Sequence, residues 1–470
     1  MKTHPAPADV CAMGNGQGGT KLPFREKFAY GLGSGAEILI ANAIIILANP
    51  VYYLGLGIQP FWLGLILLST KLFDAFIDPT MGHISDNTRW RWGRRKPYIL
   101  IGAAATGVLC FLMWRPPAMG TQGYIWYFLV VAVLYYTTYT VFYAPYNALG
   151  YEMTKDYDER SSLMAYKWGI GSAVGLLILP RLLPLCYTID PHNAAVGARI
   201  WGPVVGLMIL FFALAPSFIP RERVVHQEKL PFVKALFTTM QNKPFLLLCG
   251  IIVLCLTGIL TMLQLRQFLN MAYIFQMNEQ TSADMNMWFD YTYGIINMVC
   301  MFVASSLAAR FDKKKVLVVG LLLIVVGLAS CCLYITPKYP YLQLLLAVLT
   351  APGMSCVWVL TNSCIADVCD YDELQTGLRR EGFYGAVYAF FMKLGSALGL
   401  GLGGLILYLV GFDKELTAQS AETILRFRVV FALVPAAVFA AAVVLALKYP
   451  ITKQKLLAVQ QQLAQRREQI

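Results

Sequence analysis

Charged residues are scarce in this chain of 470 residues, because Asp, Glu, Lys and Arg together make up 14% of it whereas hydrophobic residues make up 58%. A soluble domain of this length needs far more polar side chains to cover its surface. The composition therefore excludes an ordinary soluble globular protein, and it indicates that lipid surrounds most of the chain.

Several short motifs are also missing. The eleven cysteines lie mostly inside apolar stretches and show neither metal-ligand spacing nor an extracellular disulfide framework, so we interpret them as small apolar residues. Residues 1–26 contain no apolar core followed by a small-residue cleavage site, and we therefore expect no removable signal peptide. The phosphate-cradling P-loop is absent as well, which argues against direct use of ATP.

Long hydrophobic runs, in contrast, recur along the whole chain. A helix needs about 20 mostly apolar residues to cross a bilayer, and twelve such segments are separated by short polar loops. The predicted spans are residues 30–54, 59–83, 97–114, 123–149, 166–188, 200–220, 244–268, 288–310, 315–336, 341–366, 384–410 and 425–448. The sequence thus predicts an all-α protein with twelve transmembrane helices.

The net charge of +12 reflects membrane topology rather than a nucleic-acid partner. Lys and Arg are concentrated in every second loop, above all in residues 89–96, 221–243 and 313–315, and are sparse in the others. Because positively charged loops stay on the cytoplasmic side, both termini are predicted to be cytoplasmic. We expect a multi-pass protein of the cell membrane, in a bacterium the inner membrane.

An internal repeat relates the two halves of the chain. The sequence Asp-Tyr-Asp-Glu occurs at residues 156–159 after the fourth span and at residues 370–373 after the tenth, and a basic run follows both the second and the eighth span. Two six-helix halves of equal orientation are the arrangement of alternating-access carriers with a site at the midplane. A scaffold without transport is the structural alternative.

The repeat divides the chain into five predicted parts. They are a cytoplasmic segment (1–26), a six-helix bundle (27–220), a cytoplasmic linker (221–243), a second six-helix bundle (244–448) and a cytoplasmic tail (449–470). The tail either lies on the inner membrane surface or forms a solvated helix.

Three charges interrupt the second span. Lys71, Asp74 and Asp78 are spaced by three and four residues, so all three project from one helical face. Facing lipid, each would cost about 2.5 to 3.5 kcal/mol, and such residues usually line a cavity or an ion pathway. Two carboxylates one turn apart favour binding of H⁺ or a metal cation, and Thr140 could add an oxygen ligand for Na⁺. A purely structural ion pair is the alternative.

Further charges and aromatic residues are expected around this site. Lys393 in the eleventh span is predicted to be a mobile partner of the two carboxylates or a helix-packing charge. Glu37 is expected to face the same cavity, whereas Lys167 either joins it or extends to the membrane surface. Candidate solute-binding residues, which could equally be packing or interfacial aromatics, are Glu37, Tyr139, Tyr143, Asn147, Trp168 and Lys393.

Charges near the cytoplasmic ends of the helices could hold an inward gate shut through ion pairs, or could simply be solvated loop charges. The candidate gate residues are Asp86, Arg94, Arg95, Asp156, Arg160, Asp372 and Arg380.

Five motifs then identify a family. They occupy residues 27–33 (KFAYGLG), 73–79 (FDAFIDP), 86–97 (DNTRWRWGRRKP), 148–160 (ALGYEMTKDYDER) and 370–382 (DYDELQTGLRREG). With them, nearly the whole chain resembles the glycoside-pentoside-hexuronide:cation symporters, the melibiose permease group of the major facilitator superfamily.

The resemblance implies roles for individual residues. It matches Asp74, Asp78 and Thr140 to the cation site, Lys71 to the basic residue before it, and Lys393 to the lysine of the eleventh span. Tyr143 and Asn147 stand where the melibiose permease has an aspartate and a tryptophan, so a galactoside is not the expected solute.

We therefore predict symport of a sugar, glycoside or uronate with H⁺ or Na⁺ by a monomer that needs no cofactor. Eukaryotic lysolipid carriers share the architecture, which makes an amphipathic lipid an alternative solute. An intramembrane prenyltransferase-type enzyme is a further alternative, because the aspartate spacing superficially imitates its motifs. A sensor that transports nothing is the last alternative.

Overall fold

The computed structural model describes residues 22–88, 90–154, 157–220, 239–376, 381–414, 416 and 418–468. Within these ranges the chain is almost entirely helical and contains no strand. Twelve of the described helices are long and apolar enough to cross a membrane. The predicted set of twelve spans is confirmed.

The first six spans begin with α1, which continues into the π-helical segment η1 (Asn49–Gly55). Their bounds are α1 (Phe24–Ala48), α2 (Pro60–Asn87), α3 (Lys96–Met113), α4 (Thr121–Met153), α5 (Tyr157–Tyr187) and α6 (Ala194–Phe218).

The second six spans begin in a similar way, because α8 also continues into a π-helical segment. Their bounds are α8 (Lys243–Leu269) with η2 (Asn270–Ile274), α9 (Glu279–Arg310), α10 (Lys313–Tyr334), η3 (Pro340–Gln343) with α11 (Leu344–Thr376), α12 (Glu381–Val410) and α13 (Ala421–Lys448). The terminal helix α14 (Lys453–Glu468) then leaves the bundle.

Side-chain caps explain why several of these helices begin where they do. Asn278 accepts a hydrogen bond from the backbone N–H of Thr281, and Asn242 and Ser420 cap α8 and α13 in the same way. The cap at Asn278 starts α9 at Glu279, nine residues before the predicted span, so the polar segment before residue 288 is helical rather than loop.

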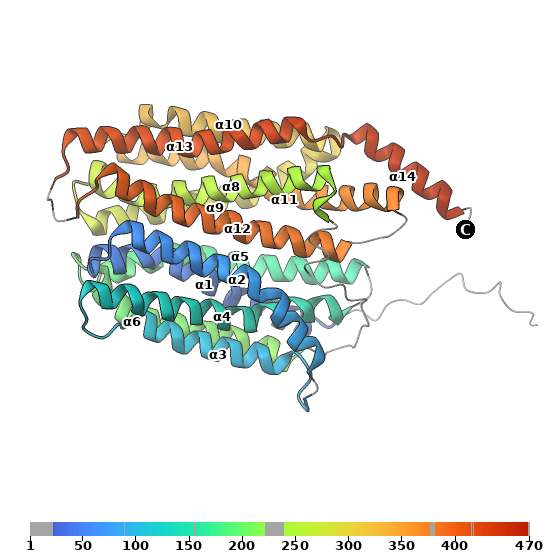
Figure 1. The fold of residues 1–470 in the computed structure, drawn as a ribbon, viewed down its shortest axis with the longest axis horizontal. Coiled ribbons are helices and arrows are strands. Elements are labelled where there is room, and N and C mark those ends of the chain that lie inside the picture. The colour runs from blue at the N-terminus through green and yellow to red at the C-terminus, as the bar shows by residue number, and fades with distance from the viewer. Residues whose placement is uncertain are drawn as a thin grey trace, which may run out of the picture.

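The helices form two groups that lie side by side, as Figure 1 shows with α1–α6 in the lower half of the view and α8–α13 in the upper half. Contacts between the groups run mainly through α2 with α12 and through α5 with α9. The predicted linker is mostly outside the described residues, and its bounds stay a prediction.

The basic runs of the repeat occupy corresponding places in the two groups. Arg95, before α3, pairs with Glu152 near the end of α4, and Lys313, at the start of α10, pairs with Asp367 near the end of α11. The acidic repeat differs, because residues 370–373 continue α11 whereas residues 157–159 lie in the first turn of α5.

Twelve alternating spans place the start of α1 and the end of α13 at the same end of the molecule, here called the terminus end. At the opposite end the two groups touch closely: the Tyr53 hydroxyl donates to the carbonyl of Phe412 at 3.1 Å, and Lys414 donates to the carbonyl of Leu54 at 3.2 Å. Gly64 and Gly404 bring the backbones of α2 and α12 together there, since a Cβ on Gly404 would lie 2.7 Å from the Cα of Gly64.

The tail helix α14 packs against α11 near the terminus end. Ile451, before α14, and Val459 and Leu463 within it are buried, and Gln460 donates to Asp370 at 3.3 Å. The tail is thus helical and one side of it is covered by protein, while its place relative to the membrane surface stays a prediction.

A charged site between the two bundles

The three charges of α2 share one side of the helix, as their spacing predicts. Asp74 is completely buried and Lys71 is buried, whereas the Asp78 side chain is 24% exposed. A carboxylate without any exposed surface requires compensating charges or donors nearby. The partners of Asp74 therefore decide what this part of the molecule can do.

Lys393 of α12 supplies the main compensation. Its Nζ lies 2.9 Å from Oδ2 of Asp74 and 2.6 Å from Oδ2 of Asp78. One ammonium group thus bridges two carboxylates that are one helical turn apart. Because α2 and α12 belong to different groups of helices, this ion pair also links the two bundles.

Thr140 of α4 completes the surroundings of Asp74. Its hydroxyl, which is fully buried, donates to Oδ1 of Asp74 at 2.6 Å, and it also lies beside Asp78. Carboxylate and hydroxyl oxygens are the ligand types that small hard cations take. The oxygens of Asp74, Asp78 and Thr140 can therefore hold a proton or a small cation where the Lys393 ammonium now lies.

Lys71 was expected beside the two aspartates of its own helix, but it lies over an aromatic ring. Its Nζ is 4.3 Å from the centroid of the Tyr136 ring and 6.0 Å from that of Tyr139, a cation–π arrangement. Lys393, not Lys71, makes the close ion pairs with the aspartates. Tyr136 was missed by sequence reasoning, although its position one turn before Tyr139 and Thr140 places it on the same face of α4.

A second charged group lies within the first bundle. Nζ of Lys167 is 3.1 Å from Oε2 of Glu37 and donates to Oδ1 of Asn147 at 2.5 Å. Lys167 is only 4% exposed, so the alternative that it extends to the membrane surface is wrong. The structure thus brings together α1, α4 and α5 through three residues that the sequence had marked.

Aromatic rings lie beside both of these charged groups. The rings of Tyr139 and Tyr143 are 5.2 Å apart, and Nζ of Lys393 lies 5.6 Å from the Tyr143 ring. The Trp168 ring lies 5.0 Å from Nζ of Lys167. All of the residues predicted for solute binding therefore fall in one region, but their role stays a prediction.

The candidate gate residues are only partly described. Arg94 and Arg95 both pair with Glu152 of α4, which belongs to the same bundle. Asp372 is buried beside Tyr384. The side chains of Asp86, Asp156, Arg160 and Arg380 lie outside the described residues, so the gate stays a prediction; Glu152, a partner that the sequence pattern did not reveal, is added to its neighbourhood.

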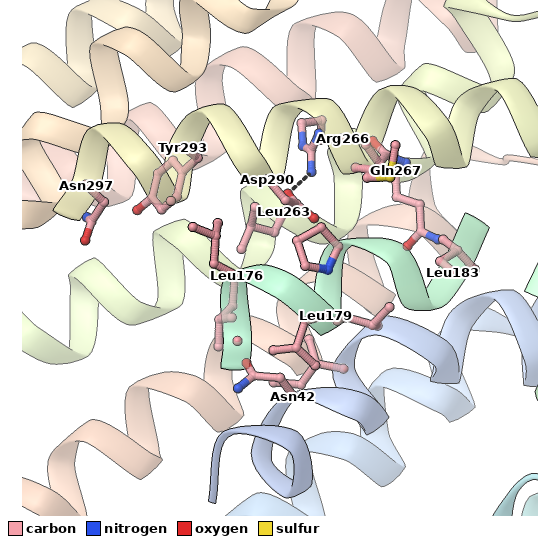
Figure 2. A pocket seen from close by; sticks show the side chains of 18 of the residues that line it. Asn42, Leu176, Leu179, Leu183, Leu263, Arg266, Gln267, Asp290, Tyr293 and Asn297 are labelled. Atoms are coloured by element: carbon pink, nitrogen blue, oxygen red, sulfur yellow. Dashed lines mark hydrogen bonds and ion pairs between the residues drawn. The ribbon is translucent and has the colours of Figure 1, made fainter. Parts of the chain in front are cut away.

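A cavity of about 420 Å³ lies elsewhere between the bundles, lined by α1 and α5 on one side and by α8 and α9 on the other. Figure 2 shows Arg266 and Asp290 in its wall, joined by an ion pair of 2.8 Å. None of the residues predicted for solute binding lines this cavity. Both charges interrupt apolar spans, and that signal, which led to Asp74, would also have led to them.

Comparisons with known proteins agree on the class of the molecule. The family described as MFS/sugar transport protein matches residues 29–453. The inner membrane symporter YicJ of Escherichia coli K12 is 28% identical, over 94% of this chain and 95% of that protein. A protein of the same organism named glucuronide carrier protein homolog is 26% identical, over 93% of this chain and 94% of its own.

Among solved structures, one reported under proton dependent oligopeptide transporters superposes with a TM-score of 0.65 at 13% identity, covering 94% of this chain and 100% of that one. At this identity the likeness concerns the fold alone.

Proposed function

The chain belongs to the MFS/sugar transport protein family, whose members are transporters rather than enzymes, and from that membership we propose that it couples a sugar, glycoside or uronate to H⁺ or Na⁺ by alternating access. The resemblance to the symporters and the major facilitator superfamily fold are confirmed. The prenyltransferase alternative is thereby removed.

The observation that carries the proposal is the bridge from Lys393 to Asp74 and Asp78. Together with Lys71, the group contains two positive and two negative charges and is neutral. A further cation would leave it with a net positive charge in surroundings of low dielectric constant, which is unfavourable. The coupling ion and the Lys393 ammonium therefore compete for the same carboxylate oxygens.

This competition couples ion binding to the motion of the bundles. When H⁺ or Na⁺ takes the place of the ammonium group, α2 and α12 lose a bridge between them. Lys393 then needs another partner, and the Tyr143 ring at 5.6 Å lies within its reach. A bound solute that satisfies Lys393 makes ion and solute binding mutually favourable, with a coupling of about 1 to 3 kcal/mol.

The solute is proposed to bind between the bridge and the Glu37–Lys167 pair. Tyr139, Tyr143 and Trp168 offer aromatic faces, and Asn147 offers amide groups for sugar hydroxyls. Similarity along nearly its whole length to a protein named glucuronide carrier protein homolog supports including uronates among the solutes.

The topology of the carrier is part of the same proposal. We place the terminus end in the cytoplasm, because the basic loops lie there, and we propose that a single chain carries out the cycle. Since the opposite end is closed by the contacts of Tyr53, Lys414 and Gly404, the structure corresponds to a state closed to the outside.

Uptake into proteoliposomes tests the proposal. A panel of sugars, glycosides, uronates and a lysolipid is offered, with Na⁺ and pH gradients imposed separately. We expect one gradient to drive accumulation of a sugar or sugar acid. Asp78→Asn should abolish that accumulation while leaving solute counterflow measurable, because exchange of bound solute needs no net ion movement.

Glu422→Gln is the matched control, since that carboxylate is exposed and pairs with its helical neighbour Arg426. Accumulation that responds to neither gradient, or that moves only the lysolipid, contradicts the proposal.

A further inference from the structure

The cavity between the bundles is mostly apolar, but part of its wall is polar and is not used by the charged site. Its volume of about 420 Å³ is within the range of small-molecule pockets, about 300 to 1,000 Å³. Amide side chains reach it from both bundles, namely Asn42, Gln264, Gln267, Asn286 and Asn297. An occupant of this cavity therefore meets apolar side chains and a smaller set of polar groups.

Arg266 is the dominant charge in the wall. It is 4% exposed, and its guanidinium lies 3.8 Å from the centre of the Phe289 ring. Nη2 donates to Oδ1 of Asp290 at 2.8 Å, whereas Nε and Nη1 are buried and have no acceptor among the described residues. A buried cation with unused donors is costly unless something accepts from them.

Two neighbouring amide side chains also have N–H donors without an acceptor among the described residues. Nε2 of Gln264 and Nδ2 of Asn286 are buried without an acceptor among the described residues, and both residues line the cavity. Oδ1 of Asn286 already accepts from Asn270 at 2.7 Å, which fixes the direction of that amide. The wall formed by α8 and α9 therefore offers an excess of N–H donors over acceptors.

We propose that this wall binds the acid group of an anionic sugar, a carboxylate or a sulfonate, with Arg266 as the residue that selects it. Such a group brings two or three acceptor oxygens and one negative charge, which match the unused donors of Arg266, Gln264 and Asn286. The inference rests on the proposed function and narrows it to sugar acids, which bind here at a position separate from the one proposed between the bridge and the Glu37–Lys167 pair.

Asp290 has a definite part in this arrangement. Its side chain is 38% exposed, far more than that of Arg266, and it lines the same cavity. In the empty cavity it balances the buried cation, and it repels a second anion. Removal of its charge should therefore improve acid binding, whereas a pair that only holds α8 to α9 would be weakened equally from either side.

The test compares two solutes that differ only in the acid group, para-nitrophenyl β-D-glucuronide and para-nitrophenyl β-D-glucoside. Counterflow in proteoliposomes and thermal stabilisation of the purified full-length chain are measured for both. In the wild type we expect the glucuronide to be preferred. Arg266→Gln should lower kcat/KM for the glucuronide roughly 10- to 100-fold while changing that for the glucoside less than threefold.

Two more variants separate binding from folding. Arg266→Lys should restore part of the preference through its charge, and Asp290→Asn should raise the preference for the glucuronide at least threefold. Arg426→Gln, which removes an exposed arginine of α13, is the control.

If Arg266→Gln and Asp290→Asn each lower kcat/KM equally for both solutes, the pair is structural and the inference is overturned. If Arg266→Gln cannot be purified folded, the Asp290→Asn comparison decides by the same criterion. Counterflow of the glucoside alone in the wild type overturns the inference but leaves the proposed function standing. Counterflow of no panel solute contradicts the proposed function itself.

Discussion

Replacing Lys393 with Gln should make the carrier bind its coupling ion more tightly and lose its coupling. The change removes the ammonium group that lies 2.9 Å and 2.6 Å from the oxygens of Asp74 and Asp78. Two positive and two negative charges become one positive and two negative, so the site changes from neutral to a net charge of −1. A cation then enters without displacing anything.

The size of the effect follows from the geometry. At an effective dielectric constant of about 20, each of the two contacts corresponds to roughly 6 kcal/mol of Coulomb attraction. Desolvation cancels most of this, and breaking a buried pair from one side typically costs about 3 to 5 kcal/mol. If the Lys393 ammonium opposes ion binding by about 2 kcal/mol in the wild type, its replacement by Gln raises the affinity for the ion ~30-fold.

Thermal unfolding of the purified protein measures this affinity, because an ion that binds only the folded state stabilises it by RT ln(1 + [L]/Kd). Titration with Na⁺, and separately with H⁺, should show half-maximal stabilisation at a concentration ~30-fold lower in Lys393→Gln. The variant should also be less stable than the wild type without the ion. Gradient-driven uptake should disappear, because nothing releases the bound ion.

An ion titration that coincides with that of the wild type within twofold would refute the reasoning, since it would mean that Lys393 does not compete with the ion. Lys338→Gln is the matched control, because that lysine is exposed and lies beside a single aromatic ring.

Three further predictions concern neighbouring features. Thr140→Val removes a hydroxyl oxygen that could bind Na⁺, so Na⁺ affinity in the same titration should fall by about 1 to 3 kcal/mol, or roughly 5- to 150-fold, whereas H⁺ affinity should rise because Oδ1 of Asp74 loses its donor. Glu152→Gln removes the counter-charge of the buried Arg95, and the free energy of unfolding should drop by about 3 to 5 kcal/mol in a denaturation experiment. Gly404→Val would place Cβ 2.6 Å from the carbonyl oxygen of Pro60, so it should wedge the closed end apart and speed maleimide labelling of a cysteine introduced at position 53 at least tenfold.

Each of these has a matched variant in the same chain. Thr140→Ser keeps the hydroxyl and should titrate like the wild type; equal changes of ion affinity in both variants would rule out the hydroxyl as the cause. Glu422→Gln breaks an exposed pair and should cost at most about 1 kcal/mol. Gly385→Val adds the same volume to α12 where a Cβ meets nothing within 4 Å, so faster labelling there would argue against a local wedge.

Patterns within single segments of the sequence were sufficient to predict the transmembrane helices. Hydrophobic length predicted twelve spans, and the offsets of three and four predicted that Lys71, Asp74 and Asp78 share one side of α2. Boundaries were less certain: the polar start of α9, capped by Asn278, continues the helix beyond its apolar part.

Partners across the bundle were harder to predict. Lys393 was expected near the aspartates, but nothing in the sequence separated its role from that of Lys71, which instead lies over Tyr136. The sequence allowed Lys167 either to join the cavity or to extend to the membrane surface. Its burial beside Glu37 excluded the second alternative. Glu152 and the Arg266–Asp290 pair were not anticipated as partners at all.

By itself, then, the sequence determined where the chain crosses the membrane, that it is built from two related halves, and which helix carries buried acids, because hydrophobicity and helical periodicity act over one or two turns. Only the tertiary structure decided which cation neutralises those acids and where a cavity remains open. Ion pairs and cavities depend on side chains from helices that are hundreds of residues apart, and their meeting is set by how whole helices pack rather than by any local pattern.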